Sequence, residues 1–132
     1  NFLYVADAQN HRIRSINLST RIVQTIAGNG TGAYFGNNVL AINALVNYPY
    51  SLAFDSRTNL LYFSDGYNNR IRFINFTNNF IFDFAGGGNS TGNNILADQV
   101  FLNGPYRILL EPIYNFLYIS EDEGHRVRRI NM

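Results

Sequence analysis

Acidic and basic side chains recur together in this chain at a fixed spacing. An acid is followed five residues later by an arginine in three places, as Asp7 with Arg12, Asp65 with Arg70, and Glu121 with Arg126. A carboxylate and a guanidinium within reach of each other form charge-assisted hydrogen bonds. A basic stripe that binds phosphate would need only the arginines. Because acid and base recur together, we predict structural acid–arginine pairs across three hairpins.

A short polar segment separates the acid from the arginine in each copy, and it supplies the candidate binding residues. These are Gln9, Asn10, His11, Tyr67, Asn68, Asp122, Glu123 and His125. Histidine occupies the same position in the first and third copies, where the second copy has Asn69. A metal site needs several ligands that converge, whereas loops of separate copies are expected to lie apart. We therefore predict loop-tip binding residues and no metal site.

The other motifs that carry chemistry are missing. The Gly-rich segments 28–32 and 86–92 lack the Gly-Lys-Ser/Thr ending of a phosphate-binding loop. The acidic run 121–123 lacks the alternating oxygen ligands of a calcium loop and indicates a solvated turn. There is neither a Gly-x-Ser-x-Gly nucleophile motif nor a paired-carboxylate signature. We predict no cofactor and no catalytic residue, in a protein that is not an enzyme.

The charged residues belong to a longer sequence that occurs three times. It reads NFLYVADAQNHRIRSIN at 1–17, NLLYFSDGYNNRIRFIN at 59–75 and NFLYISEDEGHRVRRIN at 115–131, so the copies begin 58 and 56 residues apart. The Gly-rich segments recur with it, as does Asn-x-Pro-Tyr at 47–50 and 103–106. Repetition of a whole period is typical of a solenoid, a propeller or an array.

Each period contains four short stretches of strand-forming residues separated by turn residues. In the middle copy we expect strands at Tyr50–Phe54, Leu60–Ser64, Arg70–Ile74 and Phe80–Ala85. The segment LLYFS at 60–64 is apolar throughout, although a strand exposed on one face would alternate. Inner strands of a propeller blade are apolar on both sides because each blade packs between two others. The predicted fold class is all-β, with propeller blades of four antiparallel strands.

The chain resembles the NHL-repeat family in three blocks that follow in order. They are L-Y-[VFI]-[AS]-[DE]-x-x-[NG]-[HN]-R-[IV]-R-x-I, then T-I-A-G-N-G-T-G, then N-Y-P-Y-S-L-A-F-D. The segment Asn10-His11-Arg12 nearly matches the Asn-His-Leu signature that names the family, and the resemblance covers essentially all 132 residues. It implies a β-propeller, usually six-bladed, whose commonest role is to bind protein or, in some members, RNA. Certain enzymes with NHL-like propellers, the peptidyl-amidoglycolate lyases, bind metal through histidine, but that residue pattern is not visible here.

The repeat boundaries divide the chain, as one NHL-type propeller segment, into blades and loops. They give a partial blade at 1–27, a complete blade at 47–86, a partial blade at 103–132, and Gly/Asn-rich inter-blade loops at 28–46 and 87–102. A short helical turn is expected within 39–46. A closed propeller needs about four to eight blades. We therefore expect either a fragment of a longer repeat protein or a chain that self-associates through an open blade edge near Arg12–Ile16.

Composition indicates a folded protein without a charge-driven partner. Hydrophobic residues make up 46% of the chain and aromatic residues 15%, and no stretch approaches the about 20 apolar residues of a membrane span. The net charge is +1 and lysine is absent, which disfavours nucleic acid as a partner. Cysteine is absent too, and sequons at Asn17, Asn29, Asn75 and Asn89 are compatible with an extracellular or ectodomain location.

The expected function is that of a non-catalytic scaffold for protein–protein interaction. The loops 8–10, 66–68 and 122–124, with the inter-blade loops, would be displayed to a protein or peptide partner. An RNA-binding propeller is the first alternative, which salt-dependent binding would reveal. A fragment of a propeller enzyme of the lyase type is the second, and it would need convergent histidines or acids.

Overall fold

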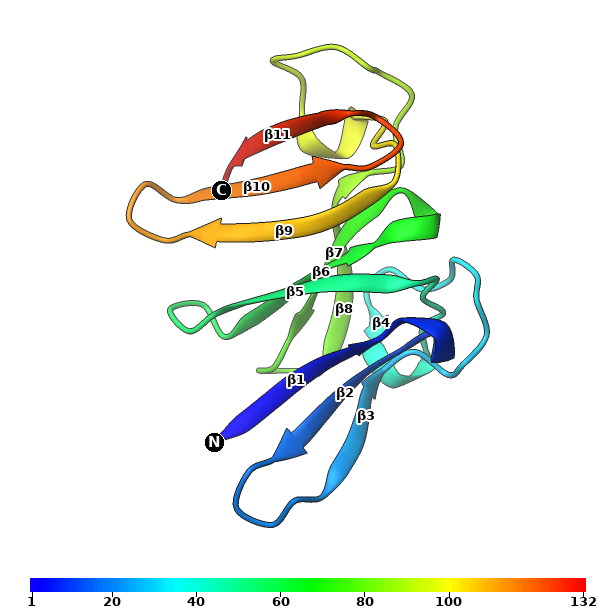
Figure 1. Cartoon of the computed structure of the whole chain (residues 1–132), viewed down its shortest axis with the longest axis vertical. Helices are drawn as coiled ribbons and strands as arrows, with labels where there is room; N and C mark the ends of the chain where they lie inside the picture. The colour runs from blue at the N-terminus through cyan, green and yellow to red at the C-terminus, as the bar shows by residue number, and fades with distance from the viewer.

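The computed structural model describes residues 1–132 as strands in three antiparallel sheets (Figure 1). The first sheet contains β1 (Phe2–Asp7), β2 (Arg12–Asn17) and β3 (Val23–Ala27). The middle sheet contains β5 (Pro49–Asp55), β6 (Leu60–Asp65), β7 (Arg70–Asn75), β8 (Phe80–Gly86) and the short β4 (Val39–Leu40). The third sheet contains β9 (Pro105–Glu111), β10 (Phe116–Glu121) and β11 (Arg126–Asn131).

The middle sheet is a complete blade, and it confirms the predicted fold class of four-stranded antiparallel propeller blades. Its strands β5 to β8 neighbour each other in chain order, each one or two residues longer than the sequence predicts. The segment 39–46 differs from expectation in its first residues. There β4 pairs antiparallel with β8 as a fifth strand, with Val39 opposite Ile81, before the expected helical turn η2 (Ala41–Asn43) begins.

The strands run between two ends of the molecule, which differ in their connections. We call one the loop end, formed by the hairpin tips 8–11, 66–69 and 122–125, which include the 3-10 turns η1 (Ala8–Asn10) and η3 (Gly66–Asn68). The opposite turn end carries the turns at 18–22, 56–59 and 112–115. In Figure 1 the loop end lies on the right. The second inter-blade connector contains one further turn, η4 (Ala97–Gln99).

The hydrophobic core lies on both faces of the middle sheet. Leu61 and Phe63 of β6 are buried against the first sheet, in a cluster that also includes Ile13. Tyr62, between them in sequence, is buried on the other face with Ile119 of the third sheet. Successive strand residues point to opposite faces, so the unbroken apolar run of β6 follows from its position between two blades.

Backbone conformation at the hairpin tips explains the recurring histidine position. His11, Asn69 and His125 each end a tip with a positive φ, of 50°, 55° and 48° respectively. Asparagine and histidine are among the non-glycine residues that adopt this left-handed region most readily. The position is therefore accounted for by the turn that it closes.

The end sheets leave their outer strand edges unpaired, but not the edge that the sequence suggested. The segment Arg12–Ile16 belongs to β2, which is paired on both sides by β1 and β3. Three-stranded sheets expose their outer strands, so β1 and β3 of the first sheet and β9 and β11 of the third each have an unpaired edge. No helix in the structure has the length and apolar character needed to cross a lipid bilayer.

Candidate functional site at the loop end

The recurring acids bind the second arginine of each triplet rather than only the first. The ion pairs are Asp7 with Arg14 at 3.1 Å, Asp65 with Arg72 at 3.2 Å, and Glu121 with both Arg126 at 2.9 Å and Arg128 at 2.6 Å. The predicted pairs of Asp7 with Arg12 and of Asp65 with Arg70 are not formed. Only in the third blade does the first arginine bind the acid.

Strand geometry explains this difference. Arg12 lies directly opposite Asp7 in the hairpin, while Arg14 is its diagonal neighbour on the same face. Arg12 instead donates to the backbone carbonyls of Asn10 and Asn29, at the start of the connector that leaves the blade. Because a long arginine side chain reaches the diagonal position, Arg14 takes the carboxylate.

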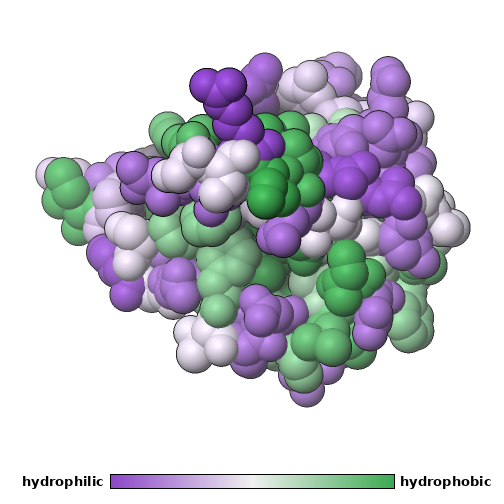
Figure 2. Space-filling model, turned by 90° about the horizontal axis from the view of Figure 1, so that it is seen from below, coloured by the Kyte–Doolittle hydropathy of each residue, from purple (hydrophilic) through white to green (hydrophobic).

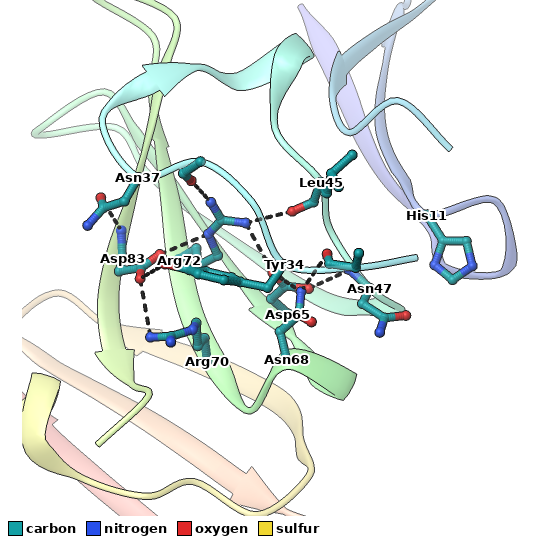
Figure 3. A network of polar contacts seen from close by, with 12 residues as sticks. His11, Tyr34, Asn37, Leu45, Asn47, Asp65, Asn68, Arg70, Arg72 and Asp83 are labelled. Atoms are coloured by element: carbon teal, nitrogen blue, oxygen red, sulfur yellow. Dashed lines mark hydrogen bonds and ion pairs between the residues drawn. The ribbon is translucent and has the colours of Figure 1, made fainter. Parts of the chain in front are cut away.

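Arg72 is the centre of a buried polar network (Figure 3). Its Nη1 donates to Asp65 Oδ2 at 3.2 Å and to the Leu45 carbonyl at 3.0 Å, and its Nη2 donates to the Gly36 carbonyl. Its Nε lies 3.0 Å from Asp83 Oδ1 as an ion pair, since neither atom makes a well-directed hydrogen bond. The network therefore holds the connector 28–46 against the middle blade.

Tyr34 of the same connector completes this attachment. Its hydroxyl donates to Asp83 Oδ2 at 2.6 Å, and the Arg70 guanidinium lies 4.2 Å from its ring centroid. Burial and the Asp83 carboxylate raise the pKa of Tyr34. Arg128 attaches the second connector, 87–102, to the third blade by donating to the carbonyls of Thr91 and Gly92. The repeated arginines thus hold loops in place.

A pocket of about 420 Å³ opens at the loop end between the middle and third blades. Its lining residues are Asn47, Tyr50, Gly66, Tyr67, Asn69, Gly104, Tyr106, Asp122 and Glu123. The Tyr50 ring lies 4.7 Å from that of Tyr106 and 6.2 Å from that of Tyr67, centroid to centroid. Tyr67 is 61% exposed and Tyr106 40% exposed. We call this site the tyrosine pocket.

Two glycines make room in the tyrosine pocket. A Cβ on Gly66 would lie 2.6 Å from ring carbons of Tyr50, so the absent side chain lets the ring pack directly on the backbone. Gly104 has a φ of +62° and stands beside Glu123. We call the contact between the first and middle blades the first junction, and that between the middle and third blades the second junction. At the first junction the residue equivalent to Gly104 is Tyr48, which has a φ of 51°. Tyr48 packs there between His11, at 4.9 Å, and Tyr67, at 4.5 Å.

The charge of the pocket is negative. Asp122 and Glu123 are exposed at its rim, and no arginine or histidine lines it. Burial, together with neighbouring Tyr67, raises the pKa of Tyr50 to about 12. The pocket therefore has the neutral phenol of Tyr50 in its lining and carboxylates at its rim.

The structure separates the predicted binding residues. Tyr67, Asp122 and Glu123 converge on the tyrosine pocket. Asn68 instead donates to Asp65 within the buried network. The other predicted residues lie outside the pocket: Gln9, Asn10 and His125 are exposed on tips, and His11 contacts Tyr48. Tyr50, Tyr106 and the two glycines were not predicted, although the change from Asn-Tyr-Pro-Tyr to Asn-Gly-Pro-Tyr marks the position.

Blades of four antiparallel strands, packed face to face, define a β-propeller. The chain is 29% identical over 137 residues to NHL repeat-containing protein 2 of Bos taurus, covering 98% of this chain and 19% of that protein. It is 28% identical over 134 residues to Protein SUPPRESSOR OF QUENCHING 1, chloroplastic, of Arabidopsis thaliana, covering 100% of this chain and 13% of that protein. These similarities agree with the resemblance to NHL-repeat proteins that the sequence indicates. It spans a fifth or less of the length of these relatives, and no family model matches it.

Solved structures show the same fold. A Bacteroides thetaiotaomicron protein of unknown function superimposes with a TM-score of 0.82 at 19% identity, covering 97% of this chain and 32% of that one. A chain of the Nidogen/Laminin Complex superimposes with a TM-score of 0.65 at 15% identity, covering 97% of this chain and 39% of that one. At these identities the likeness is one of architecture.

Proposed function

We propose that this chain is a non-catalytic propeller module that binds a protein or peptide partner at its loop end. The tyrosine pocket is the observation that carries this proposal. Tyrosine is enriched at protein interfaces because it offers a large rigid apolar surface with one polar group. Here Tyr67 and Tyr106 are exposed beside Tyr50 in a concave site. The structural relative from the Nidogen/Laminin Complex is a propeller in a complex between proteins.

The internal use of the repeated charges supports a role without catalysis. The buried carboxylates of Asp65 and Glu121 are each bound by arginines. Arg72 and Arg128 in turn bind connector carbonyls. These groups stabilise the blades and are not free to transfer protons or bind a substrate.

Selection of displayed peptides against the chain tests the proposal. We expect an enriched peptide family whose affinity falls about tenfold in Tyr67→Ala, in the range for loss of an aromatic interface residue. Tyr114→Ala is the matched control, since Tyr114 is 71% exposed on the turn end. Failure to enrich any peptide, or equal loss in both variants, would contradict binding at the loop end.

RNA is the competing ligand that the same experiment should include. Tyrosine rings stack on unpaired bases, but the carboxylates of Asp122 and Glu123 at the rim repel phosphate. We expect no binding of a single-stranded oligonucleotide at physiological salt. Tight binding that weakens steeply with added salt would favour the RNA alternative.

We also propose that further blades cover the two end sheets, from the same protein or from another copy. Figure 2 shows hydrophobic side chains among polar ones on the face below the first sheet. Leu3 is 50% exposed there, whereas its repeat equivalent Leu61 is 1% exposed. On the third sheet Val127 is 70% exposed, whereas the equivalent Ile71 is fully buried. The same positions are core positions wherever a neighbouring blade is present.

Sedimentation of the chain distinguishes the two sources of these blades. Closure by self-association predicts a dimer or larger assembly that Leu3→Glu or Val127→Glu disperses. A monomer at all concentrations would contradict self-association and assign the covering blades to a longer chain.

A further inference from the structure

We propose that the tyrosine pocket binds one cationic side chain, a lysine or an arginine, of the partner that docks at the loop end. This inference rests on the proposed binding function and specifies what the partner must present. It follows from ring geometry, rim charge and a difference between the two junctions.

The rings are arranged as a cage and not as a stack. The plane of Tyr50 is tilted by 55° from that of Tyr106 and by 68° from that of Tyr67. Rings at such angles present faces and edges around a common space instead of covering one another. An ammonium or guanidinium group is attracted to an aromatic face within about 6 Å of the ring centroid. Three tyrosines at one pocket provide several such faces.

The charge around the rings selects a cation. Asp122 and Glu123 contribute carboxylates to the lining, and no basic residue is among the lining residues. One pocket tyrosine already has a guanidinium beside it, since Arg107 Cζ lies 5.6 Å from the ring centroid of Tyr106. A similar contact joins Arg70 to Tyr34 at 4.2 Å. Tyrosine faces in this fold therefore accept guanidinium groups where one is in reach.

The first junction shows what closes such a site. There the ring of Tyr48 fills the space between His11 and Tyr67, at the repeat position of Gly104. Tyrosine adopts a positive φ at this position in one blade, and glycine does so in the next. The open pocket of about 420 Å³ therefore depends on Gly104, and its size lies in the usual range of about 300–1,000 Å³ for small binding sites.

The test uses three acetylated and amidated pentapeptides that differ only at the centre. The central residue is lysine, arginine or uncharged norleucine, each between pairs of glycines. Binding is followed by the NMR shifts of the tyrosine rings at low salt. We expect the lysine and arginine peptides to bind about tenfold more tightly than the norleucine peptide, in the range for a cation over aromatic rings with nearby carboxylates.

Three variants locate the effect. Gly104→Tyr copies the first junction and should abolish the preference for the charged peptides. The double variant Asp122→Asn with Glu123→Gln changes only exposed side chains and should lower affinity about threefold or more. Tyr114→Ala, on the opposite turn end, is the control and should leave affinity unchanged. If Gly104→Tyr fails to fold, the double variant and Tyr67→Ala still test the site.

The outcomes separate this inference from the function on which it rests. Equal binding of norleucine would overturn the cation assignment. Selected peptides that bind through Tyr67 without any lysine or arginine would also overturn it, while the proposed function would stand. Choline that binds as tightly as the lysine peptide would show a site for free cations and overturn the assignment to a partner side chain. If no peptide is selected at all, the proposed function fails first.

Discussion

The two junctions between blades are built from the same repeat positions, yet they are open at opposite ends. The first junction, between the first and middle blades, is filled at the loop end by Tyr48 and has an apolar cavity of about 680 Å³ at the turn end. The second junction, between the middle and third blades, has its pocket at the loop end and is filled at the turn end. The blades keep one backbone plan while their side chains decide where a cavity forms.

Aromatic residues account for the difference at the turn end. Phe73 and Phe82 are paired across β7 and β8 with ring centroids 5.2 Å apart, and Phe84 packs against Tyr62 at 5.2 Å. In the first blade the equivalent pair is Ser15 and Gln24, which has the same register but no ring. Both residues line the apolar cavity. The two blades thus have large or small side chains at the same paired positions. The residue types at these few positions decide whether a cavity forms at the turn end of a junction.

Breaking the network that fixes the first connector should have the largest effect. Asp65→Asn removes one of the two carboxylates that face the guanidinium of Arg72, and it does so in a position where both side chains of the pair are inaccessible to solvent. We expect a loss of about 3 kcal/mol in the free energy of unfolding, measured in urea. Asp7→Asn is the control at the same repeat position, where the pair is 26–30% exposed, and should cost under about 1 kcal/mol. Equal losses would show that burial does not distinguish the two pairs.

Emptying the filled end of the second junction should come next. Phe73→Ser copies the residue of the first blade and removes a ring packed against Tyr62 and Phe82. We expect destabilisation by about 2 kcal/mol, less than for a fully buried phenylalanine because Phe73 is half-buried. Thermal unfolding measures the change. An unaltered melting temperature would mean that the ring cluster adds nothing to the contact between these blades.

Filling the open end of the first junction should have a smaller and opposite effect. Ser15 is 5% exposed and lines the apolar cavity, so Ser15→Phe places a ring in existing space. We expect stabilisation by about 1 kcal/mol, since part of the burial energy is offset by repacking. The same thermal assay applies, with Thr77→Phe on an exposed turn as a control that should not stabilise. Destabilisation by Ser15→Phe would indicate that the cavity cannot accept the ring found in the next blade.

The smallest expected effect is a change in pH dependence at the second junction. Desolvation raises the pKa of Glu121, but Arg126, the Asn103 backbone N–H and Arg128 together lower it below the ordinary 4.5. The folded state therefore gains stability from this carboxylate above about pH 4.5 and loses it as the pH falls through the lower folded pKa. Glu121→Gln should flatten the melting temperature between pH 5 and about pH 3 relative to the parent chain. Parallel curves for the two proteins would refute this contribution.

The strands and the blade class were predictable because their signals are local. Turn residues bound each strand, and the unbroken apolar run at 60–64 indicates burial on both faces. The arginine partners were not predictable from spacing alone, because Arg12 faces Asp7 in register but binds carbonyls beyond its own hairpin. The tyrosine pocket was missed because Tyr50 and Tyr106 meet across a junction that separates them by 56 residues in the chain.

Each connector is attached to the blade that follows it, and this attachment defines the segment that could be transferred as a unit from one propeller to another. Arg72 holds the connector at Gly36 and Leu45, and Arg128 holds the next one at Thr91 and Gly92. A blade excised as a four-stranded sheet would therefore leave behind the carbonyls that its arginine needs. The modular unit begins after Gly28 and ends at Gly86. It therefore contains the connector as well as the four strands β5 to β8 of the middle sheet. Chimeras of such propellers should be cut at these glycines.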